Sequence, residues 1–268
     1  GDFRAGYVNI ESGIFTLEAQ TGSLLVDTVH AIYTAGIYDI ELRAGLDIGS
    51  SEAPLKFVVT KPWTPDGCTE NFIWSRDLYL DYDRTGGDPL TLNKQGAGNV
   101  YLTVRGRGVD ITQAGALGGV IDATGQTISI TTTLGGIGTP EAPLVIEGVR
   151  GLTLDSAADI HVRGGVSGLL IKEIAAQGSV MLEADGAFTA FANQRARVSS
   201  GTGEIDLRAS DISSMELLAA AGKELTARVA ATRAQLYIGH DAGVRVLLDG
   251  VGILSGELRS DCGLYIEE

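Results

Sequence analysis

The stretch Ile48-Gly-Ser-Ser-Glu-Ala-Pro-Leu55 occurs a second time in the chain, as Ile137-Gly-Thr-Pro-Glu-Ala-Pro-Leu144, with six of the eight positions identical. The similarity continues past the two leucines, where Lys56-Phe57 corresponds to Val145-Ile146. Self-similarity at a fixed period is typical of a solenoid, in which each coil buries its apolar face against the next. The repeated stretch therefore predicts a chain wound into stacked coils.

Each residue type in the repeated stretch has a mechanical role in such a coil. Ile48 and Ile137 are expected to point inward, and the glycine after each one allows a sharp turn. The proline favours an extended backbone leading into the next strand, where Leu55 or Leu144 returns to the core. The stretch thus predicts a turn with an apolar residue at either end.

Short alternating runs fill most of the remaining sequence, for example Tyr38-Asp-Ile-Glu-Leu42, Val100-Tyr-Leu-Thr-Val104 and Glu204-Ile-Asp-Leu207. Apolar and polar residues alternate with a period of two, which indicates β-strands. The runs are short and Asn-Gly or Asp-Gly hairpin turns are scarce, which disfavours an antiparallel sandwich. We expect an all-β, right-handed parallel β-helix that forms one domain over residues 1–268, with coils of roughly 20 to 25 residues.

Residues 215–236 allow two interpretations. Their leucines and alanines suit a helix. Gly222 interrupts the segment, however, and the pieces Glu224-Leu-Thr-Ala227 and Gln235-Leu-Tyr-Ile238 keep the alternation of the other strands. We therefore expect strands here too.

Composition and charge exclude several classes of partner. The 268 residues include 44% hydrophobic residues and 37 glycines, which suits short strands joined by tight turns. The formal net charge of −14 repels phosphate backbones, so nucleic acid is not an expected partner. No stretch approaches the roughly 18 consecutive apolar residues of a membrane helix, so we expect no membrane insertion. The start at Gly1 without a signal peptide suggests a segment of a longer protein.

Residues 61–88 break the alternating pattern and are rich in aromatic side chains, with Trp63, Trp74, Tyr79 and Tyr82 among them. We expect a loop or flap inserted in the coil. Its rings would either hold the insertion against the rod or bind a glycan or peptide. The four aromatic residues are therefore candidate binding residues.

The repeated Ile-Gly-(Ser/Thr)-x-x-x-Pro-Leu run, preceded by alternating strands, resembles the repeats of filamentous-haemagglutinin-like bacterial surface adhesins. Gly178-Ser-Val-Met-Leu-Glu-Ala-Asp-Gly-Ala187 and Ile205-Asp-Leu-Arg-Ala209 are similar to the strand–turn units of these proteins. The resemblance covers most of the chain outside 61–88. It implies a right-handed parallel β-helix that is extracellular, at the bacterial cell surface or secreted. It also implies an adhesive role, a host glycan or surface protein as partner, a monomeric segment of a larger chain, and no catalytic residue.

Acidic residues of 61–88 suggest two alternatives. Parallel β-helix hydrolases and lyases act on polysaccharides with carboxylates on one exposed face, and Asp77, Asp81 and Asp83 could serve in this way. If the segment is strand-like, Asp81 and Asp83 share one face and Tyr82 lies on the other. The spacing of Asp81, Asp83 and Asp88 also resembles the start of a calcium loop, but position twelve is Leu92, which excludes an EF-hand. A solvated acidic loop is the preferred interpretation, and Asp81 and Asp83 join the candidate binding residues.

Other chemistry finds little support in the sequence. Nucleophile-elbow, zinc-protease and phosphate-loop motifs are absent. His30, His161 and His240 are far apart, so each is expected in a strand or turn and not at a metal. Cys68 and Cys262 would lie far apart in a rod, which argues against a disulfide between them.

Overall fold

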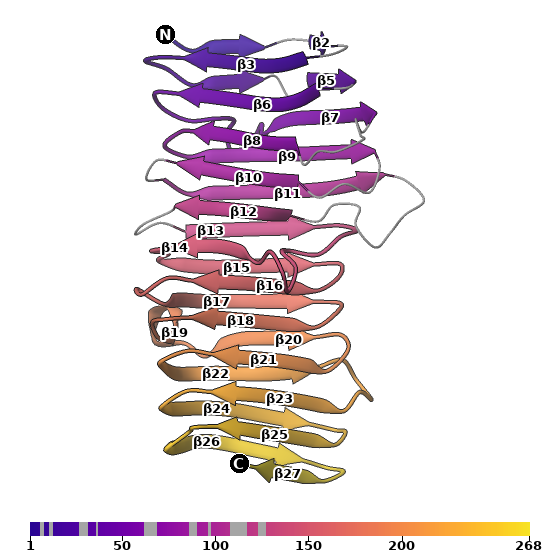
Figure 1. Cartoon of the computed structure of the whole chain (residues 1–268), viewed down its shortest axis with the longest axis vertical. Helices are drawn as coiled ribbons and strands as arrows, with labels where there is room; N and C mark the ends of the chain where they lie inside the picture. Colours follow the sequence, from indigo (N-terminus) through magenta and orange to yellow (C-terminus); the bar gives the residue numbers. More distant parts are fainter. Residues whose placement is uncertain are drawn as a thin grey trace.

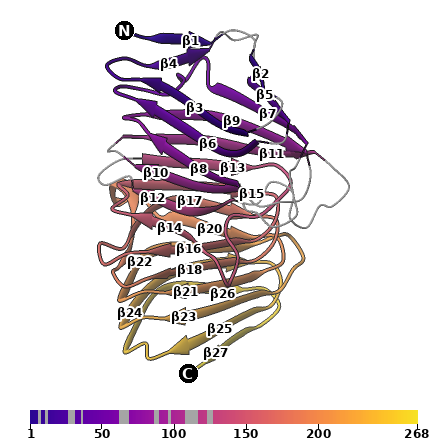
Figure 2. The same cartoon turned by 45° about the horizontal axis from the view of Figure 1, so that its top comes forward.

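The computed structural model describes residues 1–5, 8–10, 13–26, 32–35, 37–61, 69–85, 90–95, 98–107, 117–122 and 127–268. The chain forms a parallel β-helix, with the N-terminus at one end of the stack and the C-terminus at the other (Figure 1). Figure 2, tilted forward, shows the coils stacked one after another along the same axis. The parallel β-helix predicted from the repeat and the alternation is confirmed.

Two long parallel sheets face each other across the interior, and we call them sheet 1 and sheet 2. Sheet 1 contains β2 (Val8–Ile10), β5 (Ile32–Ala35), β7 (Leu55–Lys61), β9 (Leu78–Thr85), β11 (Val100–Arg107), β13 (Thr127–Thr132), β15 (Gly151–Ser156), β17 (Leu169–Ala176), β19 (Phe188–Ala190), β20 (Ala196–Ser200), β22 (Asp211–Ala219), β24 (Arg233–His240) and β26 (Ile253–Ser260). Sheet 2 contains β3 (Gly13–Ala19), β6 (Ile37–Ala44), β8 (Thr69–Trp74), β10 (Leu90–Gln95), β12 (Leu117–Asp122), β14 (Leu144–Glu147), β16 (Ile160–Gly164), β18 (Val180–Ala184), β21 (Glu204–Arg208), β23 (Leu225–Ala230), β25 (Val244–Asp249) and β27 (Leu264–Glu267). A small sheet pairs β1 (Phe3–Ala5) with β4 (Leu24–Val26), and the 3-10 turn η1 (Phe191–Asn193) follows β19.

Successive coils differ by a few residues in length. Val180, Ile205, Ala227 and Val246 are aligned with one another in sheet 2, so these coils are 25, 22 and 19 residues long. The inward positions form apolar columns, in which fully buried aliphatic side chains contribute roughly 1.5–3 kcal/mol each. Two of these three lengths lie within the expected 20 to 25 residues, and the third is one residue shorter.

The segment 215–236 is confirmed as strands. It spans the end of β22, all of β23 and the start of β24, and each strand shows alternating burial. Gly222 lies in the turn between β22 and β23 with a φ of +73°, a backbone conformation that glycine adopts without cost.

The aromatic segment 61–88 differs from the expectation. Thr69–Trp74 is aligned with Leu90–Gln95 in sheet 2, and Leu78–Thr85 with Val100–Arg107 in sheet 1. These two stretches belong to the ladder and are not a loop or flap. The reason is that their side chains alternate as in the neighbouring strands, with Ile73, Leu78, Leu80 and Tyr82 buried and Trp74, Tyr79 and Asp81 more exposed between them. Residues 62–68 and 86–88 lie outside the described residues.

The two copies of the repeated stretch form the same loop on opposite sheets. Leu55 begins β7 of sheet 1, whereas Leu144 begins β14 of sheet 2. The separation of 89 positions from Ile48 to Ile137 is therefore not a whole number of coils, and the repeat is a shared turn and not a coil unit. Its mechanical interpretation is confirmed, since both isoleucines and both leucines are fully buried.

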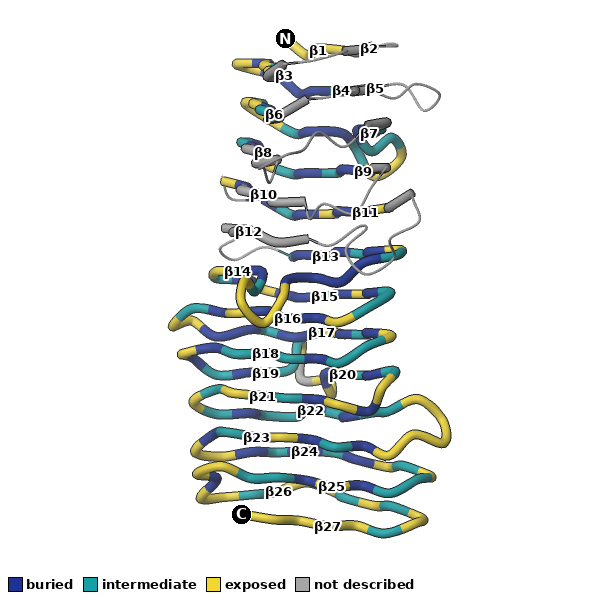
Figure 3. Tube along the Cα trace, turned by 45° about the vertical axis from the view of Figure 1, so that its right-hand side comes forward, coloured by how far each residue is buried: buried dark blue, intermediate teal, exposed yellow. Residues whose placement is uncertain are grey.

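The C-terminal end of the core is open in the described structure. Leu264 and Ile266 are aligned with the buried Val244 and Val246 of the preceding coil, yet they are 39% and 49% exposed. Figure 3 shows β27 in the colour of exposed residues. Cys262, just before β27, is an exposed free thiol, and Cys68 lies outside the described residues. Within the described residues, the structure has no helix of the length and apolarity needed to cross a bilayer.

Candidate functional site

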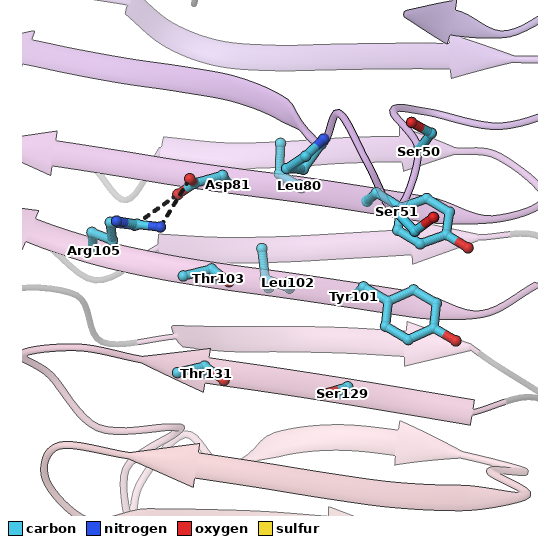
Figure 4. Close-up of a pocket in the computed structure, with 12 residues that line it drawn as sticks. Ser50, Ser51, Leu80, Asp81, Tyr101, Leu102, Thr103, Arg105, Ser129 and Thr131 are labelled. Carbon is cyan, nitrogen blue, oxygen red and sulfur yellow. Dashed lines mark hydrogen bonds and ion pairs between the residues drawn. The ribbon is translucent and has the colours of Figure 1, made fainter. Parts of the chain in front are cut away.

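A groove of about 480 Å³ lies on the outer face of sheet 1, across β9, β11 and β13 (Figure 4). The first loop, residues 49–54, forms one wall, and the strands form the floor. The described lining residues are Ser50, Ser51, Pro54, Tyr79, Leu80, Asp81, Tyr101, Leu102, Thr103, Arg105, Ser129 and Thr131. The volume is within the range of roughly 300–1,000 Å³ that is usual for small-ligand sites.

Strand alternation places the polar side chains of the groove. On β9, Leu78, Leu80 and Tyr82 are buried, which turns Tyr79 and Asp81 outward. Parallel register then stacks Tyr101 and Ser129 below Tyr79 in one column. Two residues further along the same strands, a second outward-facing column contains Asp81, Thr103 and Thr131.

Two tyrosine rings form an aromatic step at one end of the groove. The ring centroids of Tyr79 and Tyr101 are 4.7 Å apart and the rings are inclined by 9°, so they are stacked. Burial raises the pKa of Tyr79, and the nearby Asp77 carboxylate adds to this effect, which keeps the phenol protonated at neutral pH. Tyr101 is 37% exposed, and the next residue of its column is the small Ser129.

An ion pair lies opposite the aromatic step. The Arg105 guanidinium donates two hydrogen bonds to the Asp81 carboxylate, from Nε to Oδ1 at 3.0 Å and from Nη2 to Oδ2 at 3.1 Å. Figure 4 shows both bonds across the two strands. This bidentate geometry neutralises the Asp81 carboxylate inside the groove.

Two of the predicted site residues, Tyr79 and Asp81, line this groove. Asp83 lies on the same outward face of β9, so the predicted alternation is confirmed, but Asp83 is not among the lining residues. Tyr82 is 4% exposed and packs against Phe57 in the core, with ring centroids 6.4 Å apart. The prediction of Tyr82 as a binding residue is therefore wrong, because its side chain points inward.

Trp74 lies on sheet 2, away from this groove. Its indole N–H donates to Gln95 Oε1 at 2.8 Å, and the Arg43 guanidinium lies 4.7 Å from the ring centroid. Trp74 and Asp81 belong to different sheets, so they do not line one groove. Trp63 and Asp88 lie outside the described residues.

Asp77 has a structural partner at the corner between the sheets. Its Oδ1 accepts the backbone N–H of Asn99 in the next coil at 2.8 Å. Asp47 accepts the backbone N–H of Asp77 in the same way, and Asn99 accepts that of Thr127. Burial alone would raise the pKa of Asp47, but hydrogen bonds from Arg76 and from the Asp77 backbone outweigh it and lower that pKa. These side chains form a polar ladder along the corner.

The second loop, residues 138–143, has a different neighbour. It adjoins His161 of the next coil, whose backbone N–H donates to the Ile137 carbonyl. The His161 side chain is 9% exposed, and its imidazole Nδ1 has no hydrogen-bond partner among the described residues. Burial lowers the pKa of His161, against the opposing effect of the Asp159 and Glu141 carboxylates. His161 lies in β16 as a strand residue, and His240 ends β24. His30 is outside the described part.

Metal binding has no structural support among the described residues, where no group of three or more His, Cys, Asp or Glu side chains could hold an ion. The calcium site at Asp81, Asp83 and Asp88 stays a prediction, because Asp88 is not described.

Sequence reasoning missed Tyr101, Thr103, Arg105, Ser129 and Thr131. A signal was available in Val100-Tyr-Leu-Thr-Val104, whose alternation turns Tyr101 outward as Leu78-Tyr-Leu80 turns Tyr79 outward. Joining them into one surface required the register between coils. Asp77 and Asp159 occupy equivalent places beside the two loops, since their carbonyls accept the N–H groups of Ile48 and Ile137.

We compared the chain with known proteins. No family model, no curated protein and no solved structure matches it. The function proposed below is therefore based on the groove.

Proposed function

We propose that the chain is a structural and adhesive module of a large bacterial surface or secreted filamentous protein, of the filamentous-haemagglutinin-like type. The observation that carries the proposal is the groove on sheet 1, which combines a tyrosine step with hydroxyl side chains on a stack of parallel strands. The strands support its side chains on a hydrogen-bonded ladder, so little conformational freedom is lost on binding. Such a module would present a host glycan or surface protein with a preformed surface.

The role of the remaining chain in this proposal is mechanical. Each coil contacts mainly its two neighbours, and the apolar columns run through the described stack. A stack of this kind holds a binding surface at a defined distance from its anchor. The extracellular location, the bacterial source and the monomeric state within a larger chain are part of the same proposal.

The test is a screen of the purified protein against a glycan array and a panel of host-matrix proteins. Wild-type protein is compared with Tyr101→Ala, and with Tyr265→Ala as the matched control, since Tyr265 is 66% exposed on β27 outside the groove. We expect specific binding by wild type and by the control, and its loss in Tyr101→Ala with an unchanged circular dichroism spectrum. Equal loss in both variants, or no binding by folded wild type, would contradict the proposal.

The enzyme alternative, a polysaccharide hydrolase or lyase using Asp77, Asp81 and Asp83, is tested in the same screen. Acid–base catalysis needs carboxylates that can reach a substrate and exchange protons. Asp77 accepts the Asn99 N–H, and both oxygens of Asp81 accept from Arg105. Release of reducing sugar or unsaturated uronate that is lost in Asp81→Asn would favour the enzyme.

A further inference from the structure

We infer that the groove binds the ring of a neutral pyranose against the face of Tyr101 that points away from Tyr79. The inference rests on the proposed adhesive function and names the chemical class of its ligand. It follows from the shape of one column of side chains, from the hydroxyl groups beside it, and from the charge of the groove.

The shape comes from where the aromatic column ends. Tyr79 covers one face of the Tyr101 ring, at a centroid distance of 4.7 Å. The following positions of the same column are Ser129 and Thr153, which are too small to cover the other face. Figure 4 shows the Tyr101 ring above the short Ser129 side chain. A six-membered sugar ring that continued the stack would therefore lie over Ser129, with its apolar C–H face on the aromatic ring.

The polar groups suit a sugar placed in this way. Ser129, Thr103 and Thr131 line the same groove, and each hydroxyl can both donate and accept a hydrogen bond. Sugar hydroxyls have the same dual character. The first loop, with Ser50 and Ser51, adjoins Tyr79 at the other end of the aromatic column, so the hydroxyls next to the sugar are those of the strands.

The charges favour a neutral ligand. Of the described lining residues, Asp81 and Arg105 are charged, and they are paired with each other by two hydrogen bonds. A uronate or sialate would have to displace Asp81 from Arg105, within a chain of net charge −14. A neutral oligosaccharide need not break the Asp81–Arg105 pair and is not repelled by the net negative charge.

The experiment is calorimetric titration of the whole chain with neutral and anionic oligosaccharides. The neutral probes are cello-, manno- and galacto-oligosaccharides, and the anionic probes are oligogalacturonate and a sialylated oligosaccharide. We expect at least one neutral probe to bind and the anionic probes to bind at least about tenfold more weakly. Tyr101→Ala should weaken the neutral interaction about tenfold or more, whereas Tyr265→Ala should leave it unchanged.

Two further variants test the argument without removing the aromatic step. Ser129→Tyr places a ring on the face of Tyr101 that its described column neighbours leave uncovered, so we expect it to abolish binding while circular dichroism and thermal unfolding stay as in wild type. Asp81→Asn removes the carboxylate that pairs with Arg105, so we expect a gain in oligogalacturonate binding. Unchanged neutral binding in Ser129→Tyr, or no gain in Asp81→Asn, would overturn the inference.

The outcomes separate this inference from the proposed function. Preference for an anionic probe, or neutral binding that survives Tyr101→Ala, overturns the neutral pyranose and leaves an adhesive role standing. Binding to a matrix protein without any oligosaccharide binding has the same meaning. If the folded protein binds no oligosaccharide and no matrix protein, both the inference and the proposed function fail.

Discussion

The two loops that follow Ile48 and Ile137 have nearly the same sequence and the same backbone, yet their surroundings differ. In each loop the glycine has a positive φ, +68° at Gly49 and +67° at Gly138. The backbone N–H of the second loop residue donates to the carbonyl of the fifth at 3.0 Å in both, from Ser50 to Ala53 and from Thr139 to Ala142. The local sequence is thus sufficient to specify the turn.

The difference lies in the residue of the next coil that each loop adjoins. The N–H of Tyr79 donates to the Ile48 carbonyl at 2.7 Å, and the N–H of His161 donates to the Ile137 carbonyl at 2.7 Å. Beside the first loop, Tyr79 and Tyr101 stack and line a groove. Beside the second loop, His161 is buried. One turn can therefore form the wall of a site or cover a side chain, depending on what the following coil presents.

The largest loss of stability should come from replacing the loop glycines Gly49 and Gly138 by alanine. A Cβ at Gly49 would lie 2.4 Å from the Tyr79 carbonyl oxygen, and one at Gly138 would lie 2.2 Å from that of His161. Gly250 has a similar φ of +64° but open space around it, so it is the matched control. We expect about 3 kcal/mol or more of destabilisation for Gly49→Ala and Gly138→Ala, and about 1–2 kcal/mol for Gly250→Ala. Denaturant unfolding of the three variants measures this, and equal losses would refute the role of the contact.

The second-largest loss of stability should come from replacing Asp77 and Asp159, which lie two residues before Tyr79 and His161. Asp77 Oδ1 accepts the Asn99 N–H at 2.8 Å, and Asp159 Oδ1 accepts the Ser179 N–H at 2.6 Å. Replacing either by Ala leaves a backbone N–H without this acceptor, so we expect a loss of about 1–2 kcal/mol at both sites. Asn at either position should recover most of it, because an amide oxygen can accept the same bond. Thermal unfolding that shows no recovery by Asn would point to the charge instead.

The buried His161 beside the second loop should make the stability of the fold depend on pH. Tyr79, which takes its place beside the first loop, should not do so in the same pH range. Burial lowers the pKa of His161 below its ordinary 6.5, so the unfolded chain binds the proton first as pH falls. Stability is therefore complete above about pH 6.5 and decreases below it, until the folded-state pKa is reached. Asp47 acts at lower pH, because the stability from its lowered pKa is lost only as pH falls below its ordinary 3.8.

The check is the free energy of unfolding of wild type and His161→Phe between pH 7.5 and about pH 5. We expect the wild-type decrease over this range to be smaller in His161→Phe. An identical pH profile for the two proteins would show that His161 is not the sensitive group.

The smallest effect is expected from the loop hydroxyls. Ser50 Oγ accepts the Ala53 N–H and Thr139 Oγ1 accepts the Ala142 N–H, both at 3.0 Å. Ser50→Ala and Thr139→Ala should each cost about 0.5–1 kcal/mol. The exposed Ser51, replaced by Ala, serves as the control and should change little. Clearly unequal losses in the two loops would show that their surroundings influence even this local bond.

The coil architecture could be predicted because it depends on local rules. Alternation at Val100–Val104 and Glu204–Leu207 already separates inward from outward side chains, and the repeated Ile-Gly and Pro-Leu pairs mark the turns. Within 61–88, the stretches 69–74 and 78–85 were misjudged because their aromatic residues obscured the same alternation. Tyr82 is a core residue although tyrosine often lies at surfaces, and its partner Phe57 comes from the preceding strand of sheet 1.

By itself, the sequence determined the strands, the turns and the face on which each side chain lies, because these depend on residues a few positions apart. Only the tertiary structure decided which outward residues become neighbours. Tyr79, Tyr101 and Ser129 are separated by 22 and 28 positions, and coils of unequal length bring them into one column. Register between coils is set by the packing of the whole interior, so the groove, the Asp81–Arg105 pair and the burial of His161 emerge only when the coils are stacked.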